Sequence, residues 1–350
     1  MSETIAADAL GVEHAVARLK AGQLVAFPTE TVYGLGADAR NEEAVGSVFD
    51  LKGRPADHPL IVHLRSQEQL AEWASTIPTY AQKAADAFWP GPLTLVLPRA
   101  AGVPDGVTGG QDTVALRVPS HPVAHALLQT FGGGIAAPSA NRFGRISPTT
   151  ARHVADEFGE SDLLILEGGA SEVGLESTIL DASGPEPRLL RPGAITPAML
   201  EAAMGRALAT ASEAVPRAPG RLASHYAPAA SAKLVSRAFL EDESKNLEGW
   251  ALLVRLANLP EKTLARAVRL PCDVEGYARG LYAALRELDE RNPKGILIEE
   301  PPHDPDWLAV RDRLARATHG NSRHDHGESD TVETNSDVPD GLTAEEGTER

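Results

Sequence analysis

The stretch from Phe27 to Leu60 holds the side chains best suited to chemistry. It starts with F-P-T-E-T-V-Y-G-L-G and ends, after a short helical pattern, with K-G-R-P-A-D-H-P-L. Lys52 and Arg54 are two residues apart, so in an extended segment their side chains point to the same side. Such a pair of cations, facing a turn rich in hydroxyls, suits a substrate that carries phosphates and a small polar acid. Two ordinary surface cations are the alternative, but Gly53 and Pro55 stiffen this loop directly before a buried strand, where sites usually lie.

A second loop places hydroxyls and an amide ahead of an expected helix. Here A-P-S-A-N leads through G-R to S-P-T. Ser147, followed by proline, has the pattern of an N-cap with proline at the first helical position. Free N–H groups at a helix N-terminus bind anions, and Ser139, Asn141 and Thr149 beside them could hold a phosphate or a ribose. A capped helix with a hydroxyl-rich loop explains the same residues, and the two interpretations are compatible.

Several polar residues lie in or beside apolar strand patterns. They are Thr113, Arg117, Ser177 and Arg191, and His63 ends another such pattern. An unpaired charge on the apolar strand V-A-L-R-V-P is costly, so Arg117 needs an anionic partner. That partner is either a protein carboxylate or the carboxylate of a substrate. His63 is either a core histidine or, because it lies beside the Lys52–Arg54 loop, part of a site.

Other sequence features give weaker or negative evidence for a site. G-L-G-A-D-A resembles the dinucleotide fingerprint, but that motif needs its glycines at a strand-to-helix turn, so we interpret them as loop turns. No G-x-x-x-x-G-K-[ST] phosphate loop occurs. His121 and His125 have metal-ligand spacing without an obvious third ligand, which favours two surface histidines of a helix. The single cysteine, Cys272, excludes an internal disulfide and a cysteine-rich metal cage.

Composition sets the broad class. The 350 residues suggest two domains and a tail, and 42% hydrophobic with 23% charged residues are ordinary for a globular protein. The net charge of −16 argues against strong direct binding to nucleic acid. No apolar run is long enough for a membrane span, and no signal pattern opens the sequence, so we expect a protein of the reducing cytoplasm without membrane contact.

The elements that must position these residues alternate irregularly. Apolar patterns predict strands at 24–27, 60–64, 93–97, 113–118, 135–137, 162–166, 177–181 and 187–190. Helical spacing predicts helices at 11–20, 42–51, 67–74, 79–88, 121–131 and 147–158, with loops at 28–38 and 99–112. Because several strands follow one another directly, we expect a twisted mixed sheet with flanking helices rather than a regular doubly wound sheet.

The chain divides into four parts by composition. Residues 1–205 form the expected main domain, and 206–232, rich in proline, glycine and alanine, form a linker. A smaller α/β domain follows at 233–318, with a strand at 250–254, a helix at 274–291, a strand at 295–298 and a helix at 306–317. Residues 319–350 hold nine acidic residues against two arginines and almost no large apolar ones. Such a segment cannot offset its ordering entropy, so a disordered acidic tail is expected.

Eight motifs occur in a familiar order and at familiar distances. They are T-E-T-V-Y-G-L-G, K-G-R-P-x-x-H-P-L, W-P-G-P-L-T, A-L-R-V-P, A-P-S-A-N, S-P-T, G-L-E-S-T-I and L-R-P-G. Together they resemble the threonylcarbamoyl-AMP synthase, or YrdC-like, family over about residues 10–205. The segment S-H-Y-A-P and the further α/β domain resemble the two-domain form. The resemblance implies a YrdC-like twisted mixed sheet and a smaller C-terminal α/β, Rossmann-like domain.

The resemblance also implies a reaction. Members of this family join L-threonine, bicarbonate and ATP into threonylcarbamoyl-AMP and release pyrophosphate, with Mg²⁺ accompanying ATP and no metal site on the protein. A separate transferase then modifies the tRNA adenosine that follows the anticodon. The enzyme would be a nucleotidyltransferase, and its linker would fold over the pocket as a lid.

Carried over by motif, the implied site residues fall into three groups. Lys52 and Arg54 would be catalytic. L-threonine would contact Thr31, His63, Arg117, Ser139 and Ser177. ATP would contact Arg54, His58, Thr113, Asn141, Ser147, Thr149, Arg191 and Tyr226, with Ser147 against Thr149 and His225 against Tyr226 left open.

Three other functions compete with this one. An RNA-binding protein of the same fold is disfavoured by the net charge and by the lack of a basic stripe with aromatic residues. A carbamoyl-transfer domain of the hydrogenase-maturation type carries cysteine-rich zinc motifs, which one cysteine excludes. A relative with a different substrate also fits, because a fold does not fix a function.

Overall fold

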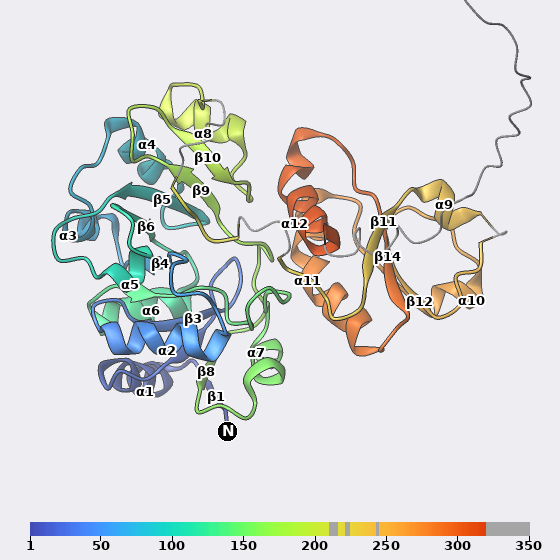
Figure 1. Ribbon diagram of the computed structural model, residues 1–350, viewed down its shortest axis with the longest axis horizontal. Coiled ribbons are helices and arrows are strands. Elements are labelled where there is room, and N and C mark those ends of the chain that lie inside the picture. The colour runs from blue at the N-terminus through green and yellow to red at the C-terminus, as the bar shows by residue number, and fades with distance from the viewer. Residues whose placement is uncertain (210–215, 221–224, 243–244, 320–350) are drawn as a thin grey trace, which may run out of the picture.

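The computed structural model describes residues 1–209, 216–220, 225–242 and 245–319. Within these ranges the chain forms two α/β units, each built around its own sheet (Figure 1). Most of the expected linker and smaller domain is described. The expected acidic tail lies, apart from His319, outside the described residues.

Ten strands of the described chain form one mixed sheet in the larger unit, in the order β1-β8-β2-β3-β7-β4-β6-β5-β9-β10. Four neighbouring pairs are parallel and five are antiparallel, so the expected mixed sheet is confirmed. The strands are β1 (Glu3–Ala6), β2 (Val25–Phe27), β3 (Gly34–Asp38), β4 (Ile61–His63), β5 (Leu93–Pro98), β6 (Thr113–Arg117), β7 (Ile135–Ala136), β8 (Leu164–Glu167), β9 (Thr178–Asp181) and β10 (Arg188–Arg191).

Helices cover both faces of this sheet. They are α1 (Ala9–Lys20), α2 (Glu42–Lys52), η1 (Gln67–Gln69), α3 (Leu70–Trp73), α4 (Thr79–Phe88), α5 (Asp105–Thr108), α6 (Pro122–Phe131), α7 (Ala151–Phe158) and α8 (Pro197–Met204). Strand side chains alternate between the faces. Val25 and Phe27 pack with α1 and α6, whereas Ala26 packs in the core on the other face, with α2 and α4. A sheet buried on both sides explains why its strands read as continuous apolar runs.

Two local expectations are wrong. Gly34 and Gly36 lie in strand β3 and not in loop turns: a Cβ on Gly36 would lie 2.8 Å from Phe27 and 2.9 Å from Ile135, so only glycine lets these strands pack. The helix after the second loop begins at Ala151, three residues later than its proline suggested. Its N-cap is Thr150, whose hydroxyl accepts the N–H of His153.

The smaller unit has a parallel sheet in the order β11-β14-β12-β13. Its elements are β11 (Ala232–Val235), α9 (Arg237–Glu241), β12 (Trp250–Val254), α10 (Glu261–Leu264), β13 (Ala267–Arg269), α11 (Val274–Glu290), β14 (Gly295–Glu299), η2 (Pro305–Trp307) and α12 (Leu308–Thr318). Helices α11 and α12 lie between this sheet and the larger unit (Figure 1). At the end of β14, the buried Glu299 carboxylate accepts the N–H groups of three successive residues, Arg255, Leu256 and Ala257.

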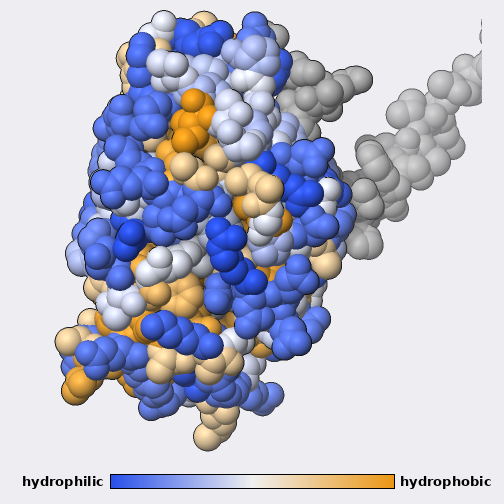
Figure 2. All heavy atoms as spheres, turned by 90° about the vertical axis from the view of Figure 1, so that its left-hand side faces the viewer, coloured by the Kyte–Doolittle hydropathy of each residue, from blue (hydrophilic) through white to orange (hydrophobic). Residues whose placement is uncertain are grey.

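The surface is mainly hydrophilic on the face of the larger unit that points away from the smaller one. Figure 2 shows this face, on which apolar side chains gather in limited areas, most of them toward the lower end. None of the helices in the described part of the chain combines the length and the apolar character that a membrane crossing needs.

Candidate active site

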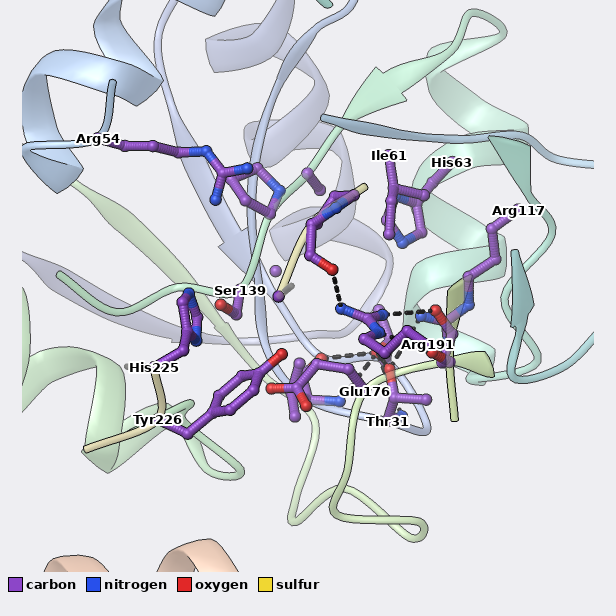
Figure 3. A pocket seen from close by; sticks show the side chains of 18 residues that line it. Thr31, Arg54, Ile61, His63, Arg117, Ser139, Glu176, Arg191, His225 and Tyr226 are labelled. Carbon is purple, nitrogen blue, oxygen red and sulfur yellow. Dashed lines mark hydrogen bonds between the residues drawn. The ribbon is translucent and has the colours of Figure 1, made fainter. Parts of the chain in front are cut away.

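A pocket opens in the larger unit where loops follow the ends of its central strands. Its empty volume is about 540 Å³, and this figure includes open solvent at its mouth. Strands β4 and β6 pair in parallel with His63 opposite Arg117, so both side chains reach the same edge. Linker residues His225 and Tyr226 enter from the other side (Figure 3).

The pocket brings together nine residues that the sequence singled out. They are Thr31, Arg54, His63, Arg117, Ser139, Ser177, Arg191, His225 and Tyr226. The residues that it does not bring in are Lys52, His58, Thr113, Asn141, Ser147 and Thr149, none of which lines it. Among the lining residues, sequence reasoning assigned no role to Thr29 or Glu176.

Arg117 has the protein carboxylate that its burial requires. Its Nη2 lies 2.7 Å from Glu30 Oε1, and both side chains are almost fully buried. Nη1 donates to Thr31 Oγ1 at 2.9 Å, and Nε donates to the carbonyl of Gly91 at 3.3 Å. The guanidinium is therefore fixed in the pocket wall. Glu30 stands in the quoted T-E-T motif, so the partner of Arg117 was visible in the sequence but not identifiable without the strand pairing.

Arg191 crosses the pocket floor from the end of β10. It donates through Nε to the carbonyl of Ser177 (3.0 Å), through Nη2 to Ser177 Oγ (3.1 Å) and through Nη1 to the carbonyl of Pro219 (3.2 Å). The Ser177 hydroxyl also shares a hydrogen bond with Thr94 (2.8 Å). All these acceptors are uncharged, so within the described chain the charge of Arg191 has no ion-pair partner.

Arg54 lies opposite Arg191 in Figure 3, after the end of α2. Its Nη2 donates to the carbonyl of Pro59 at 2.9 Å, and its buried Nε has no hydrogen-bond partner among the residues that the structure describes. Burial lowers the pKa of Arg54 to about 10, which leaves it charged at neutral pH. Two arginines without a bound carboxylate in the described residues make the pocket attractive to an anion.

Lys52 is the last residue of α2, and Gly53 follows in the left-handed conformation, so the assumption of an extended Lys52–Arg54 segment is wrong. The Lys52 ammonium is buried and donates to the carbonyl oxygens of Ser139, at 2.6 Å, and Asn141. Burial, and then the charge of Arg54, hold its pKa well below the usual range. Lys52 thus anchors the loop that carries Ser139 into the pocket.

Two buried histidines contact the pocket in neutral form. Burial, together with the charge of Arg117, lowers the pKa of His63 to about 3, and burial lowers that of His225 to about 3. Neither imidazole is therefore a strong base at neutral pH. His63 packs edge-to-face on Phe27, and within the described ranges the buried Nδ1 of each histidine has no hydrogen-bond partner.

Tyr226 occupies an unusual backbone position, with φ of 60°. Its ring is buried, and its hydroxyl points into the pocket, where no group of the described part of the chain hydrogen-bonds to it (Figure 3). A non-glycine residue in this conformation costs about 1 kcal/mol or more and often marks a functional position. The described linker residues thus bring a phenol into the pocket.

The remaining expected residues have other contacts. His58 packs edge-to-face on Phe143, and the Asn141 amide donates to the carbonyls of Arg142 and Arg145. Thr149 contacts His153, whereas the Ser147 hydroxyl, expected as a helix cap, donates to Glu176 Oε1 at 2.5 Å. Thr113 begins β6.

Glu176 is the acidic member of the pocket and receives contacts from both units. Its Oε2 accepts Tyr282 Oη (2.9 Å) and Arg313 Nε (2.8 Å), both from the smaller unit. Burial would raise the pKa of Glu176, but the charges of Arg313 and Arg191 and the bond from Ser147 hold it at about 2. Glu176 stands in the quoted G-L-E-S-T-I motif, but its partners Tyr282 and Arg313 are more than a hundred residues away in the sequence.

The described residues contain no group of three or more His, Cys, Asp or Glu side chains that could hold a metal ion. His121, expected on a helix surface, is instead a buried N-cap of α6, whose Nδ1 accepts the N–H of Val123. Glu176, which lines the pocket, and Glu30, which pairs with the lining residue Arg117, each have an arginine partner.

Comparison with known proteins identifies the relatives of the chain. A family model described as Telomere recombination matches residues 17–193, and one described as Threonylcarbamoyl-AMP synthase, C-terminal domain, matches 195–319. The threonylcarbamoyl-AMP synthase of Pyrococcus abyssi is 42% identical over 311 residues, covering 86% of this chain and 92% of that protein. The enzyme of the same name from Bacillus subtilis is 38% identical over 323 residues, covering 88% and 93%.

A solved structure agrees with these sequence relatives. The crystal structure of P. abyssi Sua5 complexed with L-threonine superposes with a TM-score of 0.82 at 40% identity, covering 91% of this chain and 97% of that one. Similarity therefore extends through both units. The chain belongs to the threonylcarbamoyl-AMP synthase family.

Proposed function

We propose that this protein is an L-threonylcarbamoyladenylate synthase, which converts L-threonine, bicarbonate and ATP into threonylcarbamoyl-AMP and pyrophosphate. Family membership over both units supports this proposal, as does the relative that was crystallised with L-threonine. The observation that carries it in this chain is the pair Arg54 and Arg191, two buried cations without a carboxylate partner in the described residues, in one pocket with a fixed Arg117.

Threonine would lie on the side of the pocket formed by β4, β6 and the loop after β7. A guanidinium has five N–H groups. Since Thr31 and Gly91 accept from two of them and Glu30 pairs with Nη2, Arg117 keeps N–H capacity for the amino acid's carboxylate. The hydroxyls of Thr31, Ser139 and Ser177 and the imidazole of His63 would surround the rest of the substrate.

ATP would lie between Arg54 and Arg191, with Tyr226 above it. The amine of threonine and bicarbonate form a carbamate with loss of water. A carbamate oxygen then attacks the α-phosphate, so the oxygen-to-phosphorus bond to AMP forms as the bond between the α-phosphate and pyrophosphate breaks. Two anions must come close together, and fixed cations lower the cost of that approach. Because the reaction transfers AMP, the enzyme is a nucleotidyltransferase in this proposal. His58, Thr113, Asn141 and either Ser147 or Thr149 remain proposed outer contacts of the nucleotide.

Mg²⁺ would be held by the phosphates of ATP rather than by a protein cage. The acidic residues at the pocket already pair with arginines, and no metal-binding cluster occurs among the described residues. Bound there, the ion would supply further positive charge at the phosphates. The low pKa of His63 leaves this residue a poor general base, so we propose that the chain contributes mainly orientation and charge neutralisation, with Lys52 acting through the loop it anchors.

The product would pass to a separate tRNA threonylcarbamoyl transferase. A mixed anhydride of this kind hydrolyses readily, so the linker residues His225 and Tyr226 would also exclude water from it. A cytoplasmic location is part of the proposal, because ATP and tRNA are both found there.

The test is pyrophosphate release by the full chain with Mg²⁺ and ATP. We expect release only when both L-threonine and bicarbonate are present, and omission of either one returns the rate to background. Release that does not depend on threonine would refute the proposed substrate. An RNA-binding protein of this fold would instead retain tRNA on a filter at physiological salt and release no pyrophosphate.

A further inference from the structure

Arg313 of α12 carries the contact between the smaller unit and the pocket. It is fully buried, and its Nε donates to Glu176 Oε2 at 2.8 Å. Its Nη2 donates to the carbonyl of Pro192 at 3.0 Å, next to Arg191 in the chain. Its guanidinium also lies over the ring of Tyr226, 5.2 Å from the ring centre. One side chain from the second unit therefore touches an acidic wall residue and the linker tyrosine.

Glu176 lies between two arginines. Arg191 donates to the carbonyl and hydroxyl of the next residue, Ser177, and Arg313 donates to the residue that follows Arg191. Figure 3 shows Glu176 and Arg191 side by side at the floor of the pocket. Although the two are neighbours, the carboxylate bonds to Arg313, Tyr282 and Ser147, and Arg191 bonds only to neutral acceptors in the described chain. The Glu176 carboxylate is therefore paired with Arg313 and not with its other neighbouring cation, Arg191.

This separation matters because opposite charges attract strongly in a buried site. Arg313 and Arg191 are the two arginines whose charges lower the pKa of Glu176. Without Arg313, the Glu176 carboxylate would therefore have only Arg191 as a cationic partner. An Arg191 engaged by Glu176 would have less positive charge to offer a phosphate.

We propose that Arg313 is a positioning residue: it holds the Glu176 carboxylate away from Arg191, so that Arg191 stays available for the anionic phosphates of the nucleotide. The inference rests on the proposed function, because it assumes that ATP occupies this pocket. It also gives the smaller unit a role in catalysis, since the pocket has its full positive charge only when α12 is docked. By linkage, bound ATP strengthens that docking in turn.

The test is calorimetric titration of Mg²⁺–ATP into the full chain and four variants. R313Q removes the charge beside Glu176, and E176Q removes the carboxylate itself. The double variant R313Q/E176Q removes both. R286Q is the matched control, because Arg286 of α11 pairs with Glu157 of the larger unit at 3.2 Å, at a site outside the pocket.

We expect R313Q to weaken ATP binding about tenfold or more, the usual effect of losing one charge-assisted contact. The double variant is expected to bind ATP within about threefold of E176Q alone, because no carboxylate is left to engage Arg191. R286Q is expected to bind within about twofold of the wild type. If R313Q weakened ATP binding only by disturbing the packing, adding the isosteric E176Q substitution would not restore it.

Three results would overturn the inference: an R313Q that binds ATP like the wild type, a double variant as weak as R313Q, or an R286Q as weak as R313Q. If R313Q does not fold, the double variant, which buries no unpaired carboxylate, carries the test. A tenfold difference between it and E176Q would then refute the inference. A wild-type chain that binds no ATP would refute the proposed function itself.

Discussion

Replacing Lys52 by methionine tests whether Lys52 holds the loop that carries Ser139 and Asn141 in place. Methionine keeps an unbranched side chain and removes the ammonium that donates to the carbonyls of Ser139 and Asn141. Each buried carbonyl that loses its donor costs about 1–3 kcal/mol, so the two together cost about 2–6 kcal/mol. Burying an ammonium is itself unfavourable, as the lowered pKa of Lys52 shows, and its removal offsets part of that cost. We expect the free energy of unfolding to fall by about 2–4 kcal/mol.

The loss of activity in this variant should exceed the loss of stability. Ser139 enters the pocket on the loop that Lys52 anchors, and a displacement of about 1 Å costs about a hundredfold in rate. Guanidinium denaturation followed by tryptophan fluorescence measures the stability, and pyrophosphate release measures the rate. Lys83→Met, on the exposed side of α4, is the matched control and should change neither. An unfolding free energy of Lys52→Met within about 0.5 kcal/mol of the wild type would refute the anchoring argument.

Three further predictions address the charges and the phenol of the pocket. Arg54→Met, which removes a cation with one hydrogen-bonded carbonyl, should weaken ATP binding at least about tenfold with little effect on the melting temperature; calorimetric titration and melting measure the two quantities. Tyr226→Phe removes a buried hydroxyl without a partner in the described residues, so the melting temperature should stay or rise while ATP binding weakens; a lower melting temperature would contradict this. The pKa of Glu176 is about 2 in the folded protein, and its ordinary value is 4.5. Ionisation of Glu176 therefore stabilises the fold by up to about 3 kcal/mol above pH 4.5, and this stabilisation is lost as the pH falls toward 2. Between pH 6 and pH 3, the free energy of unfolding measured by denaturation should therefore fall less for Glu176→Gln than for the wild type. An equal fall in both proteins would exclude the Glu176 carboxylate as its cause.

Much of the pocket could be predicted because it is assembled from strand ends. Arg117 on an apolar strand signalled the need for an anion, and the pairing of β6 with β4 places it opposite His63. The mixed sheet followed from strands that succeed one another without helices between them. These signals are local in the sequence, so periodicity and spacing were enough to show them.

Other features depended on contacts that no local pattern contains. Ser147 looked like a helix cap, but its hydroxyl bonds to Glu176, and Thr150 caps the helix instead. The glycines of β3 resembled loop turns because the close packing of Phe27 and Ile135 cannot be seen in one strand. Glu176 was part of a quoted motif without a role, because its arginine comes from a helix 137 residues later.

The carboxylate of Glu299 bears on whether the smaller unit could bind a phosphate at its own sheet. Parallel sheets of the smaller unit's kind commonly receive phosphates beyond the carboxyl ends of their strands, where successive main-chain amides converge. Here the amides of Arg255, Leu256 and Ala257 converge on an oxygen that the chain supplies from its own β14. The chain's own carboxylate therefore occupies the position at which such a sheet would receive a phosphate, and helices α11 and α12 of this unit lie against the larger unit.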